Sequence, residues 1–465
     1  MDLTQSPIAY IHKNFDRFLK ELQAYARIPS ISAPGFPKEP LEASAQWTAQ
    51  RMQQAGLCNV ELLRVSDAPP FVYGEWLKAP GKPTVLLYAH YDVQPPGREA
   101  YWKSSPFEPQ IREGRLYGRG TADDKAGGMM HLAAIEAYLK TAGELPVNIR
   151  FIIEGEEEVG SIHLQDFLKF YQERLQADVM VLTDTANLDV GLPSITYRLR
   201  GLVDAIVEVR TLDHPVHSGM WGGPVIDALT ALNQVLSRLV TREGKIAIPG
   251  FCDDVALISK TEQQQLQRLP FADEKFRREV GAVASLQWAG DSQKSVYEKI
   301  WCEPALAILG VDAPSVATTS NQIVEWARAK ISIRIVNDQD PKKMLRLLCD
   351  FLQQEPPFGC EVKATAGAAG DPWKGDIEGP AFRVAQRALA KGYGREPVFI
   401  GCGGSIPFVK PLTDAFPNMP ALLIGVEDPY TNAHGENESL HIEDWKKGIL
   451  SAVYLYKELA AQSSS

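Results

Sequence analysis

Four glutamates follow a short apolar stretch in the first half of the chain. Residues Phe151–Gly160 read FIIEGEEEVG, so the apolar stretch ends in Glu154, Glu156, Glu157 and Glu158. Neighbouring carboxylates repel one another, and away from bulk water they require a cation. Taken alone, such a run is typical of a solvated surface turn. The rest of the chain decides between these two interpretations.

Three further apolar runs lead into potential ligand residues. Thr84–Ala89 leads into His90, Ala177–Leu182 into Asp184, and Pro420–Val426 toward His434. Continuous apolar runs are typical of strands buried on both faces of a parallel sheet. In open α/β sheets, ligands bind at the carboxyl ends of the strands. We therefore expect these side chains and that of Asp123, which precedes a predicted helix, to meet at one edge of a sheet.

The resulting set contains two imidazoles and three carboxylates, from His90, Asp123, Glu158, Asp184 and His434. Such a set suits divalent zinc, with manganese and cobalt as alternatives. Five protein ligands are too many for one catalytic zinc, which uses three and keeps a position open for water. One carboxylate shared by two ions accounts for the number, so we expect two divalent ions per subunit. Two such ions can activate a water and polarise a carbonyl group.

Two more carboxylates have predicted supporting roles. Glu157 adjoins a candidate ligand and can serve as the general base that takes a proton from the water. Asp92 lies two residues beyond His90 along an extended chain, where it can orient that imidazole.

The composition is that of a globular protein without nucleic-acid or membrane partners. The 465 residues carry a formal charge of −10, and no basic run or membrane-length apolar run is present. The six cysteines form no CxxC pair, which fits a reducing compartment. With no signal peptide visible at the N-terminus, we predict a cytoplasmic location.

The middle of the chain has a different hydrophobic pattern. Ile195–Arg210 and Ile331–Val336 alternate in polarity, as antiparallel strands with one uncovered face do, and Pro224–Val240 and Pro341–Leu352 have helical periodicity. Thr241–Gly310 is polar and holds no clear period. We predict an α/β domain with a mixed, mostly parallel sheet flanked by helices, formed by residues 1–193 and 373–465. Residues 194–372 form an inserted α+β domain.

Five motifs, in order, resemble those of the M20 metallopeptidases, particularly the branch of cytosolic non-specific and carnosine dipeptidases. They are HYDVQP at His90–Pro95, YGRGTADDKAG at Tyr117–Gly127, EGEEEVGS at Glu154–Ser161, HSGMWGG at His217–Gly223 and NAHGENE at Asn432–Glu438. The resemblance extends over essentially the whole chain.

The resemblance implies roles for the metal-site residues. Asp123 would be the bridging carboxylate, joined to Asp124 by a cis peptide bond. His90 and Asp184 would hold one ion, and Glu158 and His434 the other. Glu157 would be the general base, with Asp92 supporting His90.

In the inserted domain, the resemblance implies a lid that commonly forms a homodimer contact. His217 would reach the partner subunit's active site and stabilise the oxyanion. Arg334 would bind the C-terminal carboxylate of the substrate. Gly404 and Ser405 belong to a loop that would also face the substrate.

The predicted function is hydrolysis of the peptide bond of dipeptides or similarly short peptides. An aminoacylase or carbamoyl-type amidohydrolase with the same metal site is the alternative. A dinuclear phosphoesterase is disfavoured because no Gly-rich or Arg-clustered phosphate loop is present. A non-catalytic binding protein that has kept the fold is a remote alternative, since all the ligands and the base are present.

Overall fold

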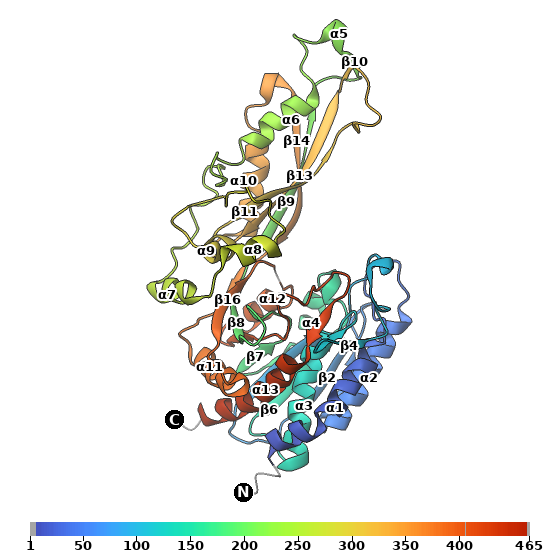
Figure 1. The fold of residues 1–465 in the computed structure, drawn as a ribbon, viewed down its shortest axis with the longest axis vertical. Coiled ribbons are helices and arrows are strands. Elements are labelled where there is room, and N and C mark those ends of the chain that lie inside the picture. The colour runs from blue at the N-terminus through green and yellow to red at the C-terminus, as the bar shows by residue number, and fades with distance from the viewer. Residues whose placement is uncertain (1–5, 405, 463–465) are drawn as a thin grey trace. The chain divides into compact units, whose positions relative to one another are not determined.

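The computed structural model describes residues 6–404 and 406–462, which form two compact units (Figure 1). The first comprises residues 6–197, Gly375–Ile400 and 406–462. The second comprises Arg198–Lys374 together with residues 401–404.

Helices and strands alternate in the first unit. Its helices are α1 (Pro7–Ala26), α2 (Glu39–Ala55), α3 (Lys125–Thr141), α4 (Leu164–Tyr171), α11 (Pro380–Tyr393), α12 (Val409–Ala415) and α13 (Ile442–Gln462). The strands of its main sheet are β1 (Cys58–Leu63), β2 (Phe71–Trp76), β3 (Thr84–His90), β6 (Asn148–Glu154), β7 (Val179–Leu182), β8 (Ser194–Leu199), β16 (Val398–Cys402) and β17 (Ala421–Leu423). A small second sheet consists of β4 (Gln110–Arg112), β5 (Arg115–Tyr117) and β18 (Ser439–His441).

The main sheet has a parallel centre and antiparallel flanks. Its order is β1-β2-β6-β3-β7-β17-β8-β15, with β16 beside β8 and the short β15 (Trp373–Lys374) at one end. The neighbours β6, β3, β7 and β17 run parallel, whereas β1, β2, β8 and β15 pair antiparallel. This confirms the predicted α/β fold with a mixed, mostly parallel sheet. The carboxyl ends of β3, β6, β7 and β17 therefore share one edge.

Helices cover both faces of this sheet (Figure 1). On one face, α3 packs along β3, and a Cβ at Gly128 would contact Ala89 and Ile153 at 3.4 Å. On the other face, the ring of Phe167 in α4 stacks on Phe71, with centroids 4.0 Å apart. The all-apolar strands are buried because both faces are covered, as the unbroken apolar runs predict.

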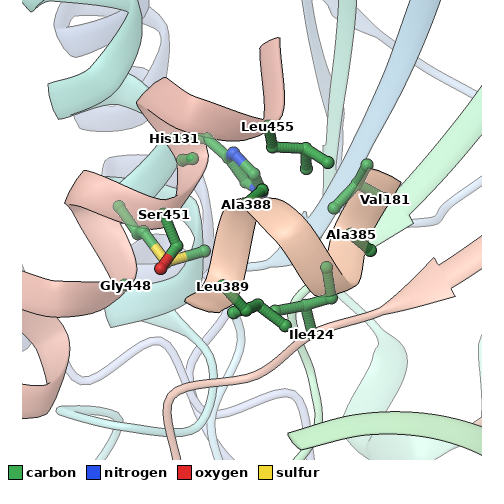
Figure 2. A pocket seen from close by; sticks show the side chains of 11 residues that line it. His131, Val181, Ala385, Ala388, Leu389, Ile424, Gly448, Ser451 and Leu455 are labelled. Carbon is green, nitrogen blue, oxygen red and sulfur yellow. The ribbon is translucent and has the colours of Figure 1, made fainter. Parts of the chain in front are cut away.

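A small cavity lies among α3, α11 and α13 (Figure 2). Its volume is about 10 Å³, close to the minimum that holds one water. His131, Leu389 and Ile424 are among the side chains around it. The ring of His131 is buried, and its Nδ1 lies 2.8 Å from the hydroxyl of Tyr456. This histidine is a core residue of the helical layer.

The second unit is a four-stranded antiparallel sheet with helices on one face. The sheet order is β11 (Ala305–Asp312), β13 (Trp326–Ile335), β9 (Gly201–Arg210) and β14 (Glu361–Gly370). Two short strands, β10 (Val216–His217) and β12 (Gln322–Ile323), pair separately. The helices are α5 (Ser218–Trp221), α6 (Ala228–Ser237), α7 (Lys260–Arg268), α8 (Asp273–Glu279), α9 (Val296–Trp301) and α10 (Pro341–Gln353).

The core of this unit follows from the alternation of apolar and polar residues along its strands. Val203, Val207 and Ile331 are fully buried against α6 and α10, and intervening residues such as Glu208 are exposed. Asp204, at a polar position of this alternation, is nevertheless buried. Its Oδ1 accepts the Ala368 N–H at 3.2 Å.

Over the described parts of the chain, no helix is both long and apolar enough to cross a membrane. All six cysteines are free thiols.

Candidate metal centre

The acidic run at the end of β6 divides into structural and site-facing glutamates. Glu154 is fully buried and accepts hydrogen bonds from the hydroxyls of Tyr88 and Ser161. Burial raises the pKa of Glu154 to about 8. Glu156 is also buried and binds His163 through its backbone N–H and its ring. These two glutamates therefore anchor the turn, and Glu157 and Glu158 are left to face the site.

Asp123 lies between two imidazoles. Its Oδ1 is 3.1 Å from Nε2 of His90, and its Oδ2 is 3.1 Å from Nε2 of His434. Nε2 of His434 is also 3.1 Å from Oε2 of Glu158. The peptide bond between Asp123 and Asp124 is cis, as the resemblance implies. The two oxygens of one carboxylate thus face two different histidines, the arrangement that a bridging ligand needs.

The potential ligand atoms cluster within 4.8 Å in three overlapping groups. The groups are His90 with Glu157 and Asp184, Asp123 with Glu158 and His434, and Asp123 with Asp184 and Glu427. The structure thus brings together all five predicted metal ligands and the predicted base.

The residues present fit divalent cations. Nε2 of His90 is buried and makes no hydrogen bond, although a carboxylate oxygen is close to it. The carboxylate of Asp123, followed by that of Glu158, raises the pKa of His434 to about 11. Both observations show surroundings that favour positive charge between the histidines and the carboxylates.

Asp92 connects His90 to the acidic turn. Nδ1 of His90 is 3.1 Å from the Asp92 carbonyl oxygen and 3.4 Å from its carboxylate. The same carboxylate accepts the backbone N–H groups of Glu157 at 3.2 Å and Glu158 at 3.1 Å. Asp92 is fully buried, so it can fix both the imidazole and the turn that carries Glu157, the predicted base.

Burial raises the pKa of Glu157 well above the ordinary value of a glutamate, and the charge of Asp184 adds to this. A carboxyl group with raised proton affinity is better suited to accept and release a proton near neutral pH.

Two glutamates at the site escape prediction from the sequence. The first is Glu427, whose carboxylate groups with those of Asp123 and Asp184. It belongs to a chain segment that reaches the sheet edge just after β17. Its position just beyond a buried strand could have indicated that it belongs to the site. The sequence pattern pointed instead to His434, which follows in the same loop.

The second is Glu438, which is fully buried. Its Oε2 accepts Nη1 of Arg119 at 2.7 Å and the N–H of Gly120 at 3.0 Å. Its Oε1 accepts the N–H groups of Ala122 at 3.1 Å and Asp123 at 3.3 Å. Glu438 thus joins the loop of His434 to the loop of Asp123.

The predicted substrate-facing residues that the structure describes, His217, Arg334 and Gly404, belong to the second unit. His217 ends β10, is exposed, and accepts the Gly219 N–H at 3.1 Å through Nδ1. Arg334 lies in β13 opposite Leu202 of β9. The N–H of Gly404 is 3.4 Å from Sγ of Cys402. Ser405 lies outside the described residues.

Comparisons with known proteins agree with one another. Residues 86–458 match the model of peptidase family M20/M25/M40. A cysteinylglycine-S-conjugate dipeptidase of Corynebacterium striatum is 31% identical over 433 residues, covering 92% of each chain. The structure of human carnosine dipeptidase 1 is similar, with a TM-score of 0.81 and 26% identity over 98% of both chains. That of the dipeptidase Dug1p from Saccharomyces cerevisiae has the same TM-score with 28% identity, covering 100% of this chain and 99% of the other.

Proposed function

The chain belongs to peptidase family M20/M25/M40 and is a metallopeptidase, hence a hydrolase, and we propose that it hydrolyses the peptide bond of dipeptides or similarly short peptides. The similar proteins named as Cys-Gly and carnosine dipeptidases support this substrate class. The catalytic domain would be residues 1–193 and 373–465, and residues 194–372 would form the lid.

The observation that carries the proposal is the position of Asp123, with one carboxylate oxygen near His90 and the other near His434. His90 and Asp184 would hold one divalent ion, Glu158 and His434 the other, and Asp123 would bridge them. Zinc is the expected metal, with manganese or cobalt as alternatives. When bound, the two ions would lower the pKa of a water and polarise the scissile carbonyl group.

Glu157 would take the proton from the attacking water and deliver it to the leaving amine. Its raised pKa supports this role. Asp92 would hold the turn that carries Glu157, since it accepts the Glu157 backbone N–H at 3.2 Å.

The lid would complete the site in a homodimer. In this proposal His217 stabilises the oxyanion in the partner subunit's site, and Arg334 binds the substrate carboxylate. Gly404 and Ser405 form a loop facing the substrate. The motif resemblance at His217–Gly223 supports the assignment of His217. A cytoplasmic location stays a prediction, supported by the six free thiols.

Two variants test the metal site and the base separately. Glu157→Ala should retain both metals but lose about 100- to 10,000-fold in kcat, because only proton transfer is impaired. His434→Ala should lose metal as well as activity. Metal content by mass spectrometry and turnover of a dipeptide library, with zinc, manganese or cobalt added back to the apo-protein, give the readouts.

Exposed residues of the same types provide the controls. Glu144→Ala and His12→Ala should behave as wild type, because both side chains are exposed and outside the metal-binding groups. An undiminished rate in Glu157→Ala would refute the mechanism. Including N-acyl and N-carbamoyl amino acids in the library tests the alternative activity, since a preference for them would identify an amidohydrolase.

A further inference from the structure

Glu427 brings an additional carboxylate to the metal centre. It lies beyond β17, where its backbone carbonyl accepts the N–H of Asn187 at 2.8 Å. This contact fixes the backbone of Glu427 beside the segment that follows β7, which carries Asp184. One carboxylate oxygen of Glu427 then lies within 4.8 Å of ligand oxygens of both Asp123 and Asp184.

Among the described residues, no protein group donates a hydrogen bond or a positive charge to the carboxylate of Glu427. Glu427 is half-buried, and among the described residues 6–404 and 406–462 none forms a hydrogen bond or ion pair with its side chain. Glu154 and Glu438 differ in this respect, because each accepts hydrogen bonds from the protein. A buried or half-buried carboxylate without donors is costly unless a cation or another donor meets it.

The carboxylates at the centre carry more negative charge than two divalent ions would offset. The three groups of potential ligands contain five carboxylates, from Asp123, Glu157, Glu158, Asp184 and Glu427, together with two histidines. Two divalent ions would supply four positive charges against these five negative ones. Moving a proton from the water to Glu157 leaves the total unchanged. The buried carboxylate of Asp92, 3.4 Å from Nδ1 of His90, adds to this excess, and a positively charged group of the substrate would reduce it.

A dipeptide supplies that charge at the required place. Its α-ammonium nitrogen is two bonds from the scissile carbonyl carbon, hence about 2.5 Å away. When that carbonyl lies at the metal ligands, the ammonium group must lie close to them as well. Its three N–H donors then need an acceptor that the metals do not occupy.

We propose that Glu427 binds the free α-ammonium group of the substrate, so that the site selects peptides with an unblocked N-terminus over N-acylated amino acids. This inference rests on the proposed dipeptidase function and deepens it. The acceptor is a carboxylate near Asp123 and Asp184, the two carboxylates assigned to the ion that His90 also holds.

The test compares two substrates of nearly the same shape, Ala-Ala and N-propionyl-alanine, which lacks only the amino group. In the metal-loaded full-length enzyme, Glu427→Gln should lower kcat/KM for Ala-Ala by about 10- to 100-fold, as expected for a lost charged hydrogen bond. For N-propionyl-alanine, kcat/KM should stay within about twofold or rise, because no ammonium group is present. Metal content should remain that of the wild type. Glu396→Gln, an exposed glutamate, is the matched control.

The outcomes separate this inference from the proposed function. Wild-type enzyme that loads metal but cleaves no dipeptide would overturn both. Wild-type enzyme that cleaves both substrates equally well would overturn the inference alone, whether or not the variant folds. Equal losses on both substrates, or loss of metal in Glu427→Gln, would make Glu427 a metal ligand or a structural residue and would also overturn it.

Discussion

Replacing Glu438 should weaken metal binding as well as the fold. The carboxylate accepts four donors, namely Arg119 and the backbone N–H groups of Gly120, Ala122 and Asp123. In Glu438→Gln the side chain keeps its length, but an NH₂ group must face one pair of these donors. The charge of Arg119, which is 1% exposed, also loses its partner. Removing one member of a buried ion pair costs about 3–5 kcal/mol.

The loss should extend to the metal because Glu438 binds the backbone of Asp123 and lies four residues beyond His434. Loss of a partner that orients a ligand typically costs about 10- to 100-fold in metal affinity. Urea unfolding of metal-loaded protein measures the first effect, and competition with a chromophoric chelator measures the second. We expect Glu438→Gln to show both.

A second buried glutamate provides the control. Glu136 in α3 is 4% exposed and accepts Nη2 of Arg51 at 2.6 Å, within the helical layer. Glu136→Gln should lose stability but keep the wild-type metal affinity, because its partners Tyr10, Arg17 and Arg51 are not ligand candidates. The reasoning about Glu438 is refuted if both variants lose metal affinity equally, or if Glu438→Gln loses less than about 1 kcal/mol.

Two further predictions concern a buried histidine of the helical layer and two glycines at the start of α3. Burial lowers the pKa of His131 to about 3, so between about pH 6.5 and pH 3 the unfolded chain binds a proton that the folded one does not. The contribution of His131 to stability should therefore fall by about 1.4 kcal/mol per pH unit as pH decreases through this window. His131→Gln should lose that contribution to the slope when urea unfolding is measured as a function of pH. In Gly127→Ala the added Cβ would clash with Asp124 Oδ1. The free energy of unfolding, measured by calorimetry, should fall by about 1–3 kcal/mol. Gly128→Ala, with no Cβ contact closer than 3.4 Å, should be nearly neutral, and equal losses in the two variants would contradict the steric explanation.

The central strands are predictable because their burial is uniform. The apolar run Thr84–Ala89 becomes β3, which ends one residue later at His90. Side chains beyond such strands converge because parallel strands share one carboxyl edge, which follows from topology rather than from distance in the sequence. This convergence makes His90, Glu158, Asp184 and His434 recognisable as one site from the sequence, whereas Asp123 joins them from the segment before α3.

The polarity pattern of Ile195–Arg210 does not reveal that this stretch divides into two strands. It forms two strands in different sheets, β8 with every residue buried and β9 with an alternating pattern. The division falls at Gly201, where a Cβ would collide with the Gly370 carbonyl oxygen. Contacts of this kind come from residues far along the chain, so local periodicity does not reveal them.

The polar stretch Thr241–Gly310 contains three short helices that periodicity does not reveal. Two of them begin with capping boxes, at Ser259 with Glu262 and at Ser295 with Glu298. The Ser-x-x-Glu spacing was a usable signal, because the serine and the glutamate satisfy each other's backbone N–H groups. Helices of six to nine residues have too few turns for an apolar face to stand out.

The chain segment after β17 carries three different functions within twelve residues. Glu427 is the proposed ammonium acceptor, His434 a candidate metal ligand, and Glu438 the link to the backbone of Asp123. Only His434 is recognisable from its residue type, since a glutamate in an acidic loop resembles solvated surface until its partners are known. The two glutamates differ in one measurable respect: Glu438 is satisfied by protein donors, and Glu427 has none among the described residues. The hydrogen bonds of Glu438 position the backbone of Asp123, whereas the carboxylate of Glu427 keeps its oxygens for the proposed ammonium group.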